Sequence, residues 1–257
     1  ALLKVKQDVV ILSHRNPDGD AIGSSLAVRR LLAENHDVTA IVPSEYPGFF
    51  DWMPGLDEVM VYDTQPDECK IKIAEASLFI LLDFNDIERI DPMGPLVEAN
   101  QNASRVMIDH HLDPQPVAEL IISETTCSST CELLFKVFSS LHYPFDESIA
   151  QALYLGILTD TGGLTYGTRP DTFEVVAALN RLGVDHFKMQ DLLFNQMSEK
   201  QLRILGMSLY KRMEVLPEFH TGIIALSKKD YTTFDIQRGD TEGIVNYILR
   251  INNLKFA

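Results

Sequence analysis

Short apolar segments alternate with helical spacing of apolar positions in the first part of the chain. The apolar segments are residues 8–13, 37–43, 77–84 and 104–110. The stretches between them that have the length of crossover helices are residues 21–35, 67–76 and 92–101. This alternation is typical of βαβ units, so we expect an α/β fold with a parallel sheet flanked by helices.

The pattern becomes mainly helical after Ile122. The segments predicted to be helices are 128–141, 147–162, 170–183, 185–196 and 199–216. Residues 217–222 resemble a boundary before the strand-like residues 223–227. We therefore expect one domain over residues 1–216, with a helical second half, and a small C-terminal α/β domain over 217–257. That second segment is short for an independent core, so we expect it to be incomplete.

Composition indicates a soluble globular protein. Of the 257 residues, 46% are apolar and 23% are charged. No apolar run reaches the roughly 18–20 residues of a membrane span, and the N-terminal residues carry no signal-peptide pattern. A cytoplasmic location is expected. Cys69, Cys127 and Cys131 are too few and too irregular for a disulfide framework or a zinc site, so we interpret them as reduced core residues.

The net charge of −15 disfavours a broad grip on duplex DNA or RNA, because that grip depends on Lys and Arg. An acidic protein can nevertheless bind phosphate when cations lie between the two. Part of the negative charge is therefore a candidate cation site.

Acidic and histidine residues collect after the predicted strands and at one helix end. The residues concerned are His14, Asp18, Asp20, Asp83, Asp109, His110, His111 and Asp160. In parallel sheets the carboxyl ends of the strands share one edge. We therefore expect the three groups that follow strands, residues 14–20, Asp83 and residues 109–111, to meet there. Carboxylates mixed with imidazoles suit Mn²⁺, Mg²⁺ or a similar ion.

Each position alone has a simpler interpretation. Asp20 can cap a helix, Asp18 can form a turn with Gly19, and Asp83 can end a strand. Three consecutive polar residues from Asp109 at the end of a buried strand are harder to explain structurally. Their joint occurrence at successive strand ends favours a functional site.

The ordered motifs resemble the DHH phosphoesterases, in the branch of bifunctional oligoribonucleases and phosphoadenosine phosphate (pAp) phosphatases. The matching segments are HRNPDGDAIGSS (14–25), LLDFNDIERI (81–90), IDHH (108–111), SSTCELLF (128–135) and GILTDTGGLTYGT (156–168). The resemblance implies that residues 1–216 are a DHH catalytic domain with linker helices. It also implies that residues 217–257 begin a truncated or partly missing substrate-binding domain, whose usual glycine-rich GGGH segment is absent before Ala257.

The resemblance implies a metal-binding and catalytic role for each residue. His14 and Asp18 would bind one divalent ion, and Asp20, His110 and Asp160 a second, with Asp83 bridging both. The resemblance implies Mn²⁺ as the ion, with Mg²⁺ or Co²⁺ as alternatives. His111 would face substrate, and Asp109 would orient its neighbours.

The implied activity is hydrolysis of short oligoribonucleotides or pAp by a hydroxide held between two metal ions. The expected partners are a short RNA or small nucleotide, without duplex DNA or a membrane, and a homodimer is left open. Arg89, Ser129 and Arg169 are candidate substrate contacts. Surface pairing for Arg89, a loop role for Arg169 and helix capping for Ser129 are equally simple interpretations.

Three alternatives stay open at this point. One alternative is a related metal-dependent inorganic pyrophosphatase, which shares the pattern. The pyrophosphatases resemble this segment with Thr at the position of Gly19 in this chain. A catalytically silent nucleotide-binding module would keep the fold without turnover. A long-strand exonuclease would need a basic, aromatic-lined channel, of which the net charge gives little sign.

Overall fold

The apolar segments of the first half form one parallel sheet in the computed structural model, which describes residues 2–237, 239–241 and 243–257. The six strands lie in the order β3-β2-β1-β4-β5-β6, and every neighbouring pair is parallel. Their bounds are β1 Asp8–Leu12, β2 Asp37–Val42, β3 Met60–Val61, β4 Leu78–Leu82, β5 Ser104–Asp109 and β6 Leu120–Ser123. The predicted α/β fold with a helix-flanked parallel sheet is confirmed.

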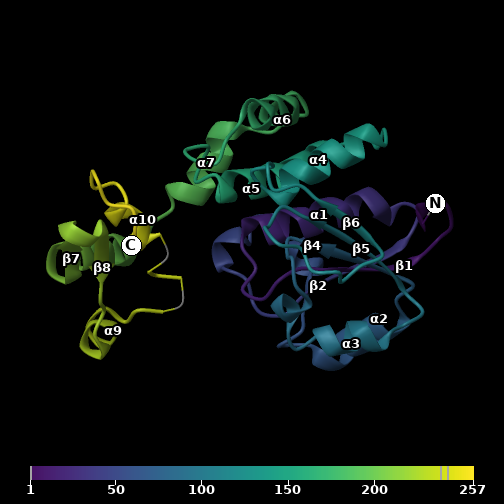
Figure 1. Cartoon of the computed structure of the whole chain (residues 1–257), viewed down its shortest axis with the longest axis horizontal. Helices are drawn as coiled ribbons and strands as arrows, with labels where there is room; N and C mark the ends of the chain where they lie inside the picture. Colours follow the sequence, from purple (N-terminus) through teal and green to yellow (C-terminus); the bar gives the residue numbers. More distant parts are fainter. Residues whose placement is uncertain (1, 238, 242) are drawn as a thin grey trace. The chain divides into compact units, whose positions relative to one another are not determined.

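Helices cover both faces of this sheet (Figure 1). On one face lie α1 (Gly19–Ala33), α4 (Thr130–Ser140) and α5 (Glu147–Asp160), and on the other lie α2 (Pro66–Glu75) and α3 (Gly94–Ala99). Successive strand residues point to opposite faces, so Ile11 enters the core under α1 and Leu12 enters the core under α2. The central strand β4 is buried throughout, as a strand covered on both faces should be.

The chain divides into two compact units, Ala1–Leu193 and Phe194–Ala257. Besides the sheet and its helices, the first unit contains α6 (Pro170–Arg181) and most of α7 (His186–Phe194). The division lies before the boundary at 216 expected from sequence. The reason is the apolar face of α8 (Glu199–Met207), where Ile204 and Leu205 pack with Ile236 and Ile244 of the C-terminal unit.

Short elements build the second unit. A π-helical turn (Ser208–Arg212) leads into β7 (Met213–Leu216), which pairs antiparallel with β8 (Thr221–Ile224). The helices α9 (Lys228–Phe234) and α10 (Ile244–Ile248) follow. The sequence prediction of one helix over 199–216 is therefore wrong in its last part, because residues 213–216 pair with β8 as a strand.

Short 3₁₀ turns complete the description. They are η1 Leu2–Lys4, η2 Gly48–Phe50, η3 Leu56–Glu58, η4 Ile87–Ile90 and η6 Pro217–Phe219. All three cysteines are buried and unpaired, as expected from their sequence context. None of the helices in the described ranges is long and apolar enough to cross a membrane.

Candidate metal centre

Three neighbouring strands deliver the candidate residues to one edge of the sheet. His14 follows β1, Asp83 follows β4, and Asp109 ends β5, and these strands lie side by side in the order β1-β4-β5. Because all three run in the same direction, their carboxyl ends meet. The strand order also reverses its direction of progress at the β1–β4 pair, which is the usual place for a ligand in such sheets.

The buried His14 directs one ring nitrogen at two carboxylates. Its Nδ1 lies 3.0 Å from the carbonyl oxygen of Arg15, which can only accept, so Nδ1 carries a proton. Its Nε2 lies 3.4 Å from Asp83 Oδ2 and 3.8 Å from Asp18 Oδ1. A lone pair on Nε2 so close to two carboxylates is repelled unless a proton or a cation lies among them.

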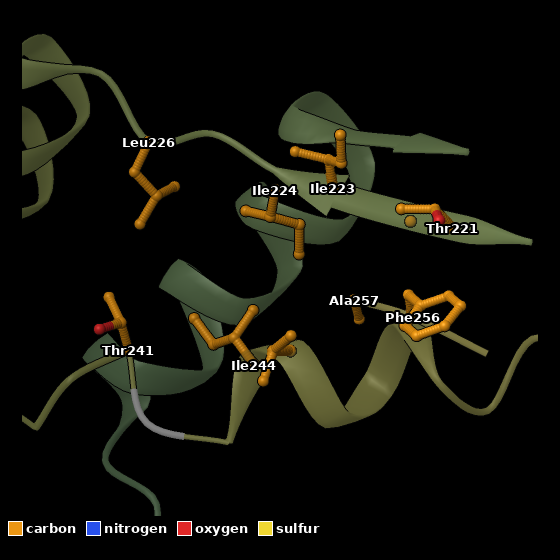
Figure 2. Close-up of a pocket in the computed structure, with 10 residues that line it drawn as sticks. Thr221, Ile223, Ile224, Leu226, Thr241, Ile244, Phe256 and Ala257 are labelled. Atoms are coloured by element: carbon orange, nitrogen blue, oxygen red, sulfur yellow. The ribbon is translucent and has the colours of Figure 1, made fainter. Parts of the chain in front are cut away.

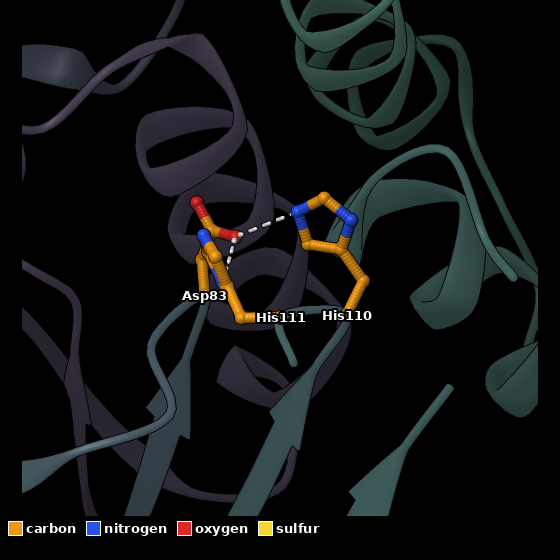
Figure 3. A group of neighbouring side chains, drawn as sticks. All are labelled: Asp83, His110 and His111. Atoms are coloured by element: carbon orange, nitrogen blue, oxygen red, sulfur yellow. Dashed lines mark ion pairs between the residues drawn. The ribbon is translucent and has the colours of Figure 1, made fainter. Parts of the chain in front are cut away.

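Asp83 is at the centre of the cluster (Figure 3). It is 1% exposed, and its backbone adopts the left-handed region with φ of 64°. Its Oδ1 lies 3.6 Å from His110 Nε2 and 3.9 Å from His111 Nδ1, while Oδ2 faces His14. The two oxygens of Asp83 thus face different imidazoles. Its left-handed backbone is a second sign of function, because unusual conformations of non-glycine residues concentrate at functional sites.

Asp20, in the first turn of α1, is held by the N-terminus of α4. Its Oδ2 accepts from Thr130 N at 2.6 Å and its Oδ1 from Cys131 N at 2.9 Å. Exposed N–H groups at a helix N-terminus favour a negative charge. This carboxylate is completely buried, yet it has two charge-assisted hydrogen bonds.

His110 joins Asp20 to the last residue of α5. Its Nε2 lies 3.2 Å from Asp160 Oδ2 and 3.8 Å from Asp20 Oδ2.

The helices α1 and α5 approach closely because glycines line their contact. A Cβ on Gly23 would lie 2.3 Å from the carbonyl oxygen of Ala152.

Asp18 is the most exposed carboxylate of the group, with a side chain that is 54% exposed. It is the N-cap of α1, and its Oδ1 accepts from the main-chain N–H groups of Asp20 and Ala21 at 3.0 Å. Burial acts against the charged form, but hydrogen bonding from His14 and from these amides outweighs it and lowers the pKa of Asp18. The capping role that sequence allowed for Asp20 thus belongs to Asp18.

Asp109 orients His111 instead of facing the other carboxylates. The fully buried Asp109 accepts from His111 Nδ1 at 2.7 Å and from His111 N at 3.1 Å. Because a carboxylate accepts, Nδ1 carries the proton and Nε2 is left for other partners. The His111 side chain is 33% exposed, so that nitrogen can meet a molecule from solution.

Without a cation, the buried carboxylates repel one another, which changes the pKa values of the cluster. Burial and Asp20 raise the pKa of Asp83 far above its ordinary value, and burial with Asp20 raises the pKa of Asp160 to about 7. Burial disfavours the imidazolium of His14, but Asp18 and Asp83 outweigh burial and raise its pKa to about 10. The pKa of His110 is raised to about 10 against burial by Asp160, Asp20 and Asp83. Divalent cations would relieve this crowding of carboxylates.

Among the residues that the structure describes, three sets of side chains have donor atoms close enough to share a metal ion. They are His14 with Asp18 and Asp83, Asp20 with His110 and Asp160, and Asp83 with His110 and His111. Within each set the donor atoms lie within 4.8 Å of one another. Asp83 and His110 each belong to two sets, so the sets form one connected centre. Its mixture of carboxylates and imidazoles fits Mn²⁺ and similar ions.

The three candidate substrate contacts lie in different settings. Ser129 is fully buried and caps α4 by accepting from Glu132 N at 3.0 Å. Arg169 is exposed and is the N-cap residue of α6, and Arg89 is exposed on η4. The structure brings none of these three side chains into the described contacts of the metal centre.

Two main-chain N–H groups at the start of α4, those of Thr130 and Cys131, bind Asp20 and are therefore not open to a substrate phosphate. The hydroxyl of Thr130 donates to Asp83 at 2.9 Å, a contact between distant positions that no local sequence pattern predicts. The available signal was the Ser-Ser-Thr run before an apolar helix, which marks only a helix start.

A pocket of about 400 Å³ lies outside the metal centre, in the second unit (Figure 2). It lies beside β8 and α10 and is mostly apolar, with Ile223, Ile224, Ile244 and Phe256 among its lining residues. All of its lining residues fall between 221 and 257, and none is a candidate metal ligand. The metal centre is therefore defined by donor geometry and not by this pocket.

Comparison with known proteins identifies the first unit's family. The model of the DHH family, N-terminal domain, matches residues 8–157. This range contains the candidate ligands His14, Asp18, Asp20, Asp83 and His110, and it ends shortly before Asp160.

Relatives cover most of this chain. The probable bifunctional oligoribonuclease and PAP phosphatase NrnA of Streptococcus mutans is 26% identical over 250 residues, which are 96% of this chain and 74% of that protein. An exopolyphosphatase-related protein from Bacteroides fragilis is 37% identical, with a TM-score of 0.93 over 96% of this chain and 74% of that one.

A putative family II inorganic pyrophosphatase from Methanococcus jannaschii shares the fold alone, at 16% identity and a TM-score of 0.53 over 84% of this chain and 71% of that one. The chain thus spans about three quarters of the length of these three proteins. Because the family match covers more than half of the residues and includes all of the clustered aspartates and histidines except Asp160, this chain belongs to the DHH family of phosphoester hydrolases.

Proposed function

We propose that the protein hydrolyses short oligoribonucleotides, 3'-phosphoadenosine 5'-phosphate, or both, with two divalent metal ions held at the edge of the sheet. The observation that carries the proposal is the position of Asp83, whose two oxygens face separate groups of imidazoles and carboxylates. A shared carboxylate is what a two-ion phosphoesterase centre needs.

In the proposed ligand assignment, His14 and Asp18 hold one ion and Asp20, His110 and Asp160 hold the other. Asp83 contributes to both. The four carboxylates together carry four negative charges, which two divalent cations would balance. We propose Mn²⁺ as the ion, because mixed oxygen and imidazole ligands suit it, with Mg²⁺ or Co²⁺ as substitutes.

The metal ions would supply a nucleophile from water at neutral pH and neutralise charge on the phosphoryl oxygens. The protein's own contribution is positional. Asp109 fixes the orientation of the partly exposed His111 ring and keeps a proton on Nδ1. In its imidazolium form, the ring is proposed to donate from Nε2 to the phosphate or to give the Nε2 proton to the leaving oxygen.

The substrate proposal is supported by the relatives and by charge. The Streptococcus mutans relative is named an oligoribonuclease and PAP phosphatase. A chain with a net charge of −15 binds an anionic substrate most readily where cations intervene. A small nucleotide needs only such a local centre, whereas a long duplex needs a basic surface.

We further propose that catalysis resides in the first unit and that the second unit belongs to a substrate-binding domain. Action in the cytoplasm is also proposed, and the three buried, unpaired cysteines are consistent with a reducing compartment.

The test compares three substrates with Mn²⁺ supplied: 3'-phosphoadenosine 5'-phosphate, a ribodinucleotide and pyrophosphate. The proposal expects hydrolysis of one or both nucleotides, and it expects Asp83→Ala to lower kcat by at least about a hundredfold. Asp67→Ala, at an exposed position paired with Lys70, is the control and should keep the wild-type rate.

Each alternative gives a different result. Preferential hydrolysis of pyrophosphate would establish the pyrophosphatase activity instead. Nucleotide binding without turnover would identify a binding module. Wild-type rates in Asp83→Ala would remove the proposed bridging role.

A further inference from the structure

One residue at the start of α4 contacts both of the most deeply buried carboxylates of the metal centre. Thr130 is completely buried, and its hydroxyl donates to Asp83 Oδ1 at 2.9 Å. Its main-chain N–H donates to Asp20 Oδ2 at 2.6 Å. Asp20 and Asp83 come from different elements and are far apart in sequence, and Thr130 joins them by donating a hydrogen bond to each.

We propose that Thr130 is a positioning residue that orients the Asp20 and Asp83 carboxylates for binding divalent cations. This inference rests on the proposed function, since it assigns Thr130 a task in the metal centre proposed above. Hydrogen bonds to the ligands of a metal ion fix their rotation and tune their basicity. The hydroxyl of Thr130 has one such ligand as its partner, and the adjacent N–H has another.

The Asp83 contact has a directional consequence. Thr130 occupies one lone-pair direction of Oδ1, the oxygen that also faces His110 and His111. The other oxygen, Oδ2, faces His14. A fixed rotation of the Asp83 carboxylate therefore keeps one oxygen for each side of the centre.

The start of α4 is held in place independently of these contacts. Ser129 caps the helix, and the buried Glu132 accepts from the main-chain N–H of Ser128 at 3.0 Å and from its hydroxyl at 2.6 Å. Glu132 also accepts from Lys136 and from Thr172 Oγ1. Thr130 is thus presented to the carboxylates by a turn that is already ordered, which is what positioning requires.

The experiment measures Mn²⁺ binding to the chelator-treated, dialysed protein by isothermal titration calorimetry. Thr130→Val keeps the β-branched shape and the main-chain N–H but removes the hydroxyl. Thr130→Ser restores the hydroxyl. Thr172→Val is the matched control, because it removes a buried threonine hydroxyl that donates to Glu132 and accepts from Arg169 N but touches no carboxylate of the metal centre. Glu132 keeps its other donors in this variant.

We expect Thr130→Val to weaken Mn²⁺ binding by about tenfold or more. Thr130→Ser should return the affinity to within about threefold of wild type, and Thr172→Val should bind Mn²⁺ as wild type does. The loss of activity in Thr130→Val should be larger at limiting than at saturating Mn²⁺. A general loss of stability would not produce that dependence.

Wild-type Mn²⁺ affinity in folded Thr130→Val would overturn the inference. If circular dichroism shows that the valine variant is unfolded, Thr130→Ala takes its place, and wild-type affinity in that variant would overturn the inference equally. Failure of the proposed function looks different. It would be seen in the wild-type protein itself, as Mn²⁺ binding without hydrolysis of any phosphoester, while the variants still decide the role of Thr130.

Discussion

At the scale of single residues, hydrogen-bond acceptors fix the tautomers of two histidines. The Arg15 carbonyl accepts a hydrogen bond from Nδ1–H of His14, and the Asp109 carboxylate accepts one from Nδ1–H of His111. Both rings therefore keep Nε2 for the centre or for substrate. The two histidines differ in what Nε2 meets, since His14 faces carboxylates and is buried while the His111 side chain is one third exposed.

His111→Ala tests this difference. We expect kcat to fall by at least about a hundredfold, in the range of a lost general acid, with Mn²⁺ binding close to wild type. His110→Ala, which removes a ring facing three carboxylates, should weaken Mn²⁺ binding. Calorimetric titration with Mn²⁺ and initial rates at saturating Mn²⁺ separate the two variants. Loss of Mn²⁺ from His111→Ala would reassign that residue as a ligand.

The sequence could predict which residues are candidates, because they follow apolar strands whose ends must meet at one sheet edge. It could not predict Thr130 as their partner. Asp20 and Thr130 are separated by 110 positions, and a hydrogen bond across that distance leaves no local periodicity. Ser129 shows the same limit, because a capping serine and a substrate serine look alike in sequence.

At the scale of elements, the closeness of α1 and α5 brings Asp20 near Asp160. Gly19 and Gly23 on α1 face Thr159 and the Ala152 carbonyl on α5. On the α5 side, a Cβ on Gly156 would lie 2.4 Å from both Asp20 Oδ1 and Cys131 Sγ. Absence of side chains at this crossing is thus a condition for the metal centre as well as for packing.

Gly156→Ala should therefore affect stability and metal binding together. The added methyl has no room, so we expect a loss of about 1–3 kcal/mol in unfolding free energy and weaker Mn²⁺ binding through displacement of Asp20. Gly206→Ala on α8 is the control, because nothing lies within 4 Å of its Cβ. That change should stabilise by roughly 0.5–1 kcal/mol. Urea denaturation and Mn²⁺ titration measure both effects, and unchanged Mn²⁺ affinity in Gly156→Ala would contradict the coupling.

Strands with strong apolar character were predicted from sequence, and weak ones were not. β1, β2, β4 and β5 lie within the predicted segments. β3 has two residues and β6 is largely exposed, so neither carries the apolar signal of a buried strand. The helical spacing of apolar positions continues into residues 213–216, so the sequence predicts a helix there. The pairing of these residues with β8 depends on a distant strand that this spacing does not reveal.

At the scale of the whole molecule, charge couples stability to pH and to metal. For the protein without divalent ions, the pKa of His14 is about 10 against an ordinary 6.5. Its stabilising contribution is therefore complete below pH 6.5 and is lost as pH rises through 10. His110 behaves in the same way. Bound Mn²⁺ reverses the preference, because metal ligands must be deprotonated.

We expect the unfolding free energy in EDTA to fall between pH 6.5 and pH 9. Free Mn²⁺ at about 100 times its Kd should add about 2.7 kcal/mol for each bound ion at a given pH. The affinity itself should increase with pH, so at a fixed Mn²⁺ concentration the difference in Tm between the two conditions should widen. Thermal unfolding at several pH values measures this, and a difference in Tm that narrows with pH would contradict the charge arrangement.

The spread of the candidate ligands from His14 to Asp160 also has a consequence for biosynthesis. A growing polypeptide has its first imidazole and two aspartates early, but the last carboxylate, at the end of α5, is added only after five strands and three further α-helices have followed. Partial chains therefore lack a complete cage and would hold manganese weakly. Ion capture would come late, once the six strands and α5 have been translated, and could not guide the pairing of the earliest strands.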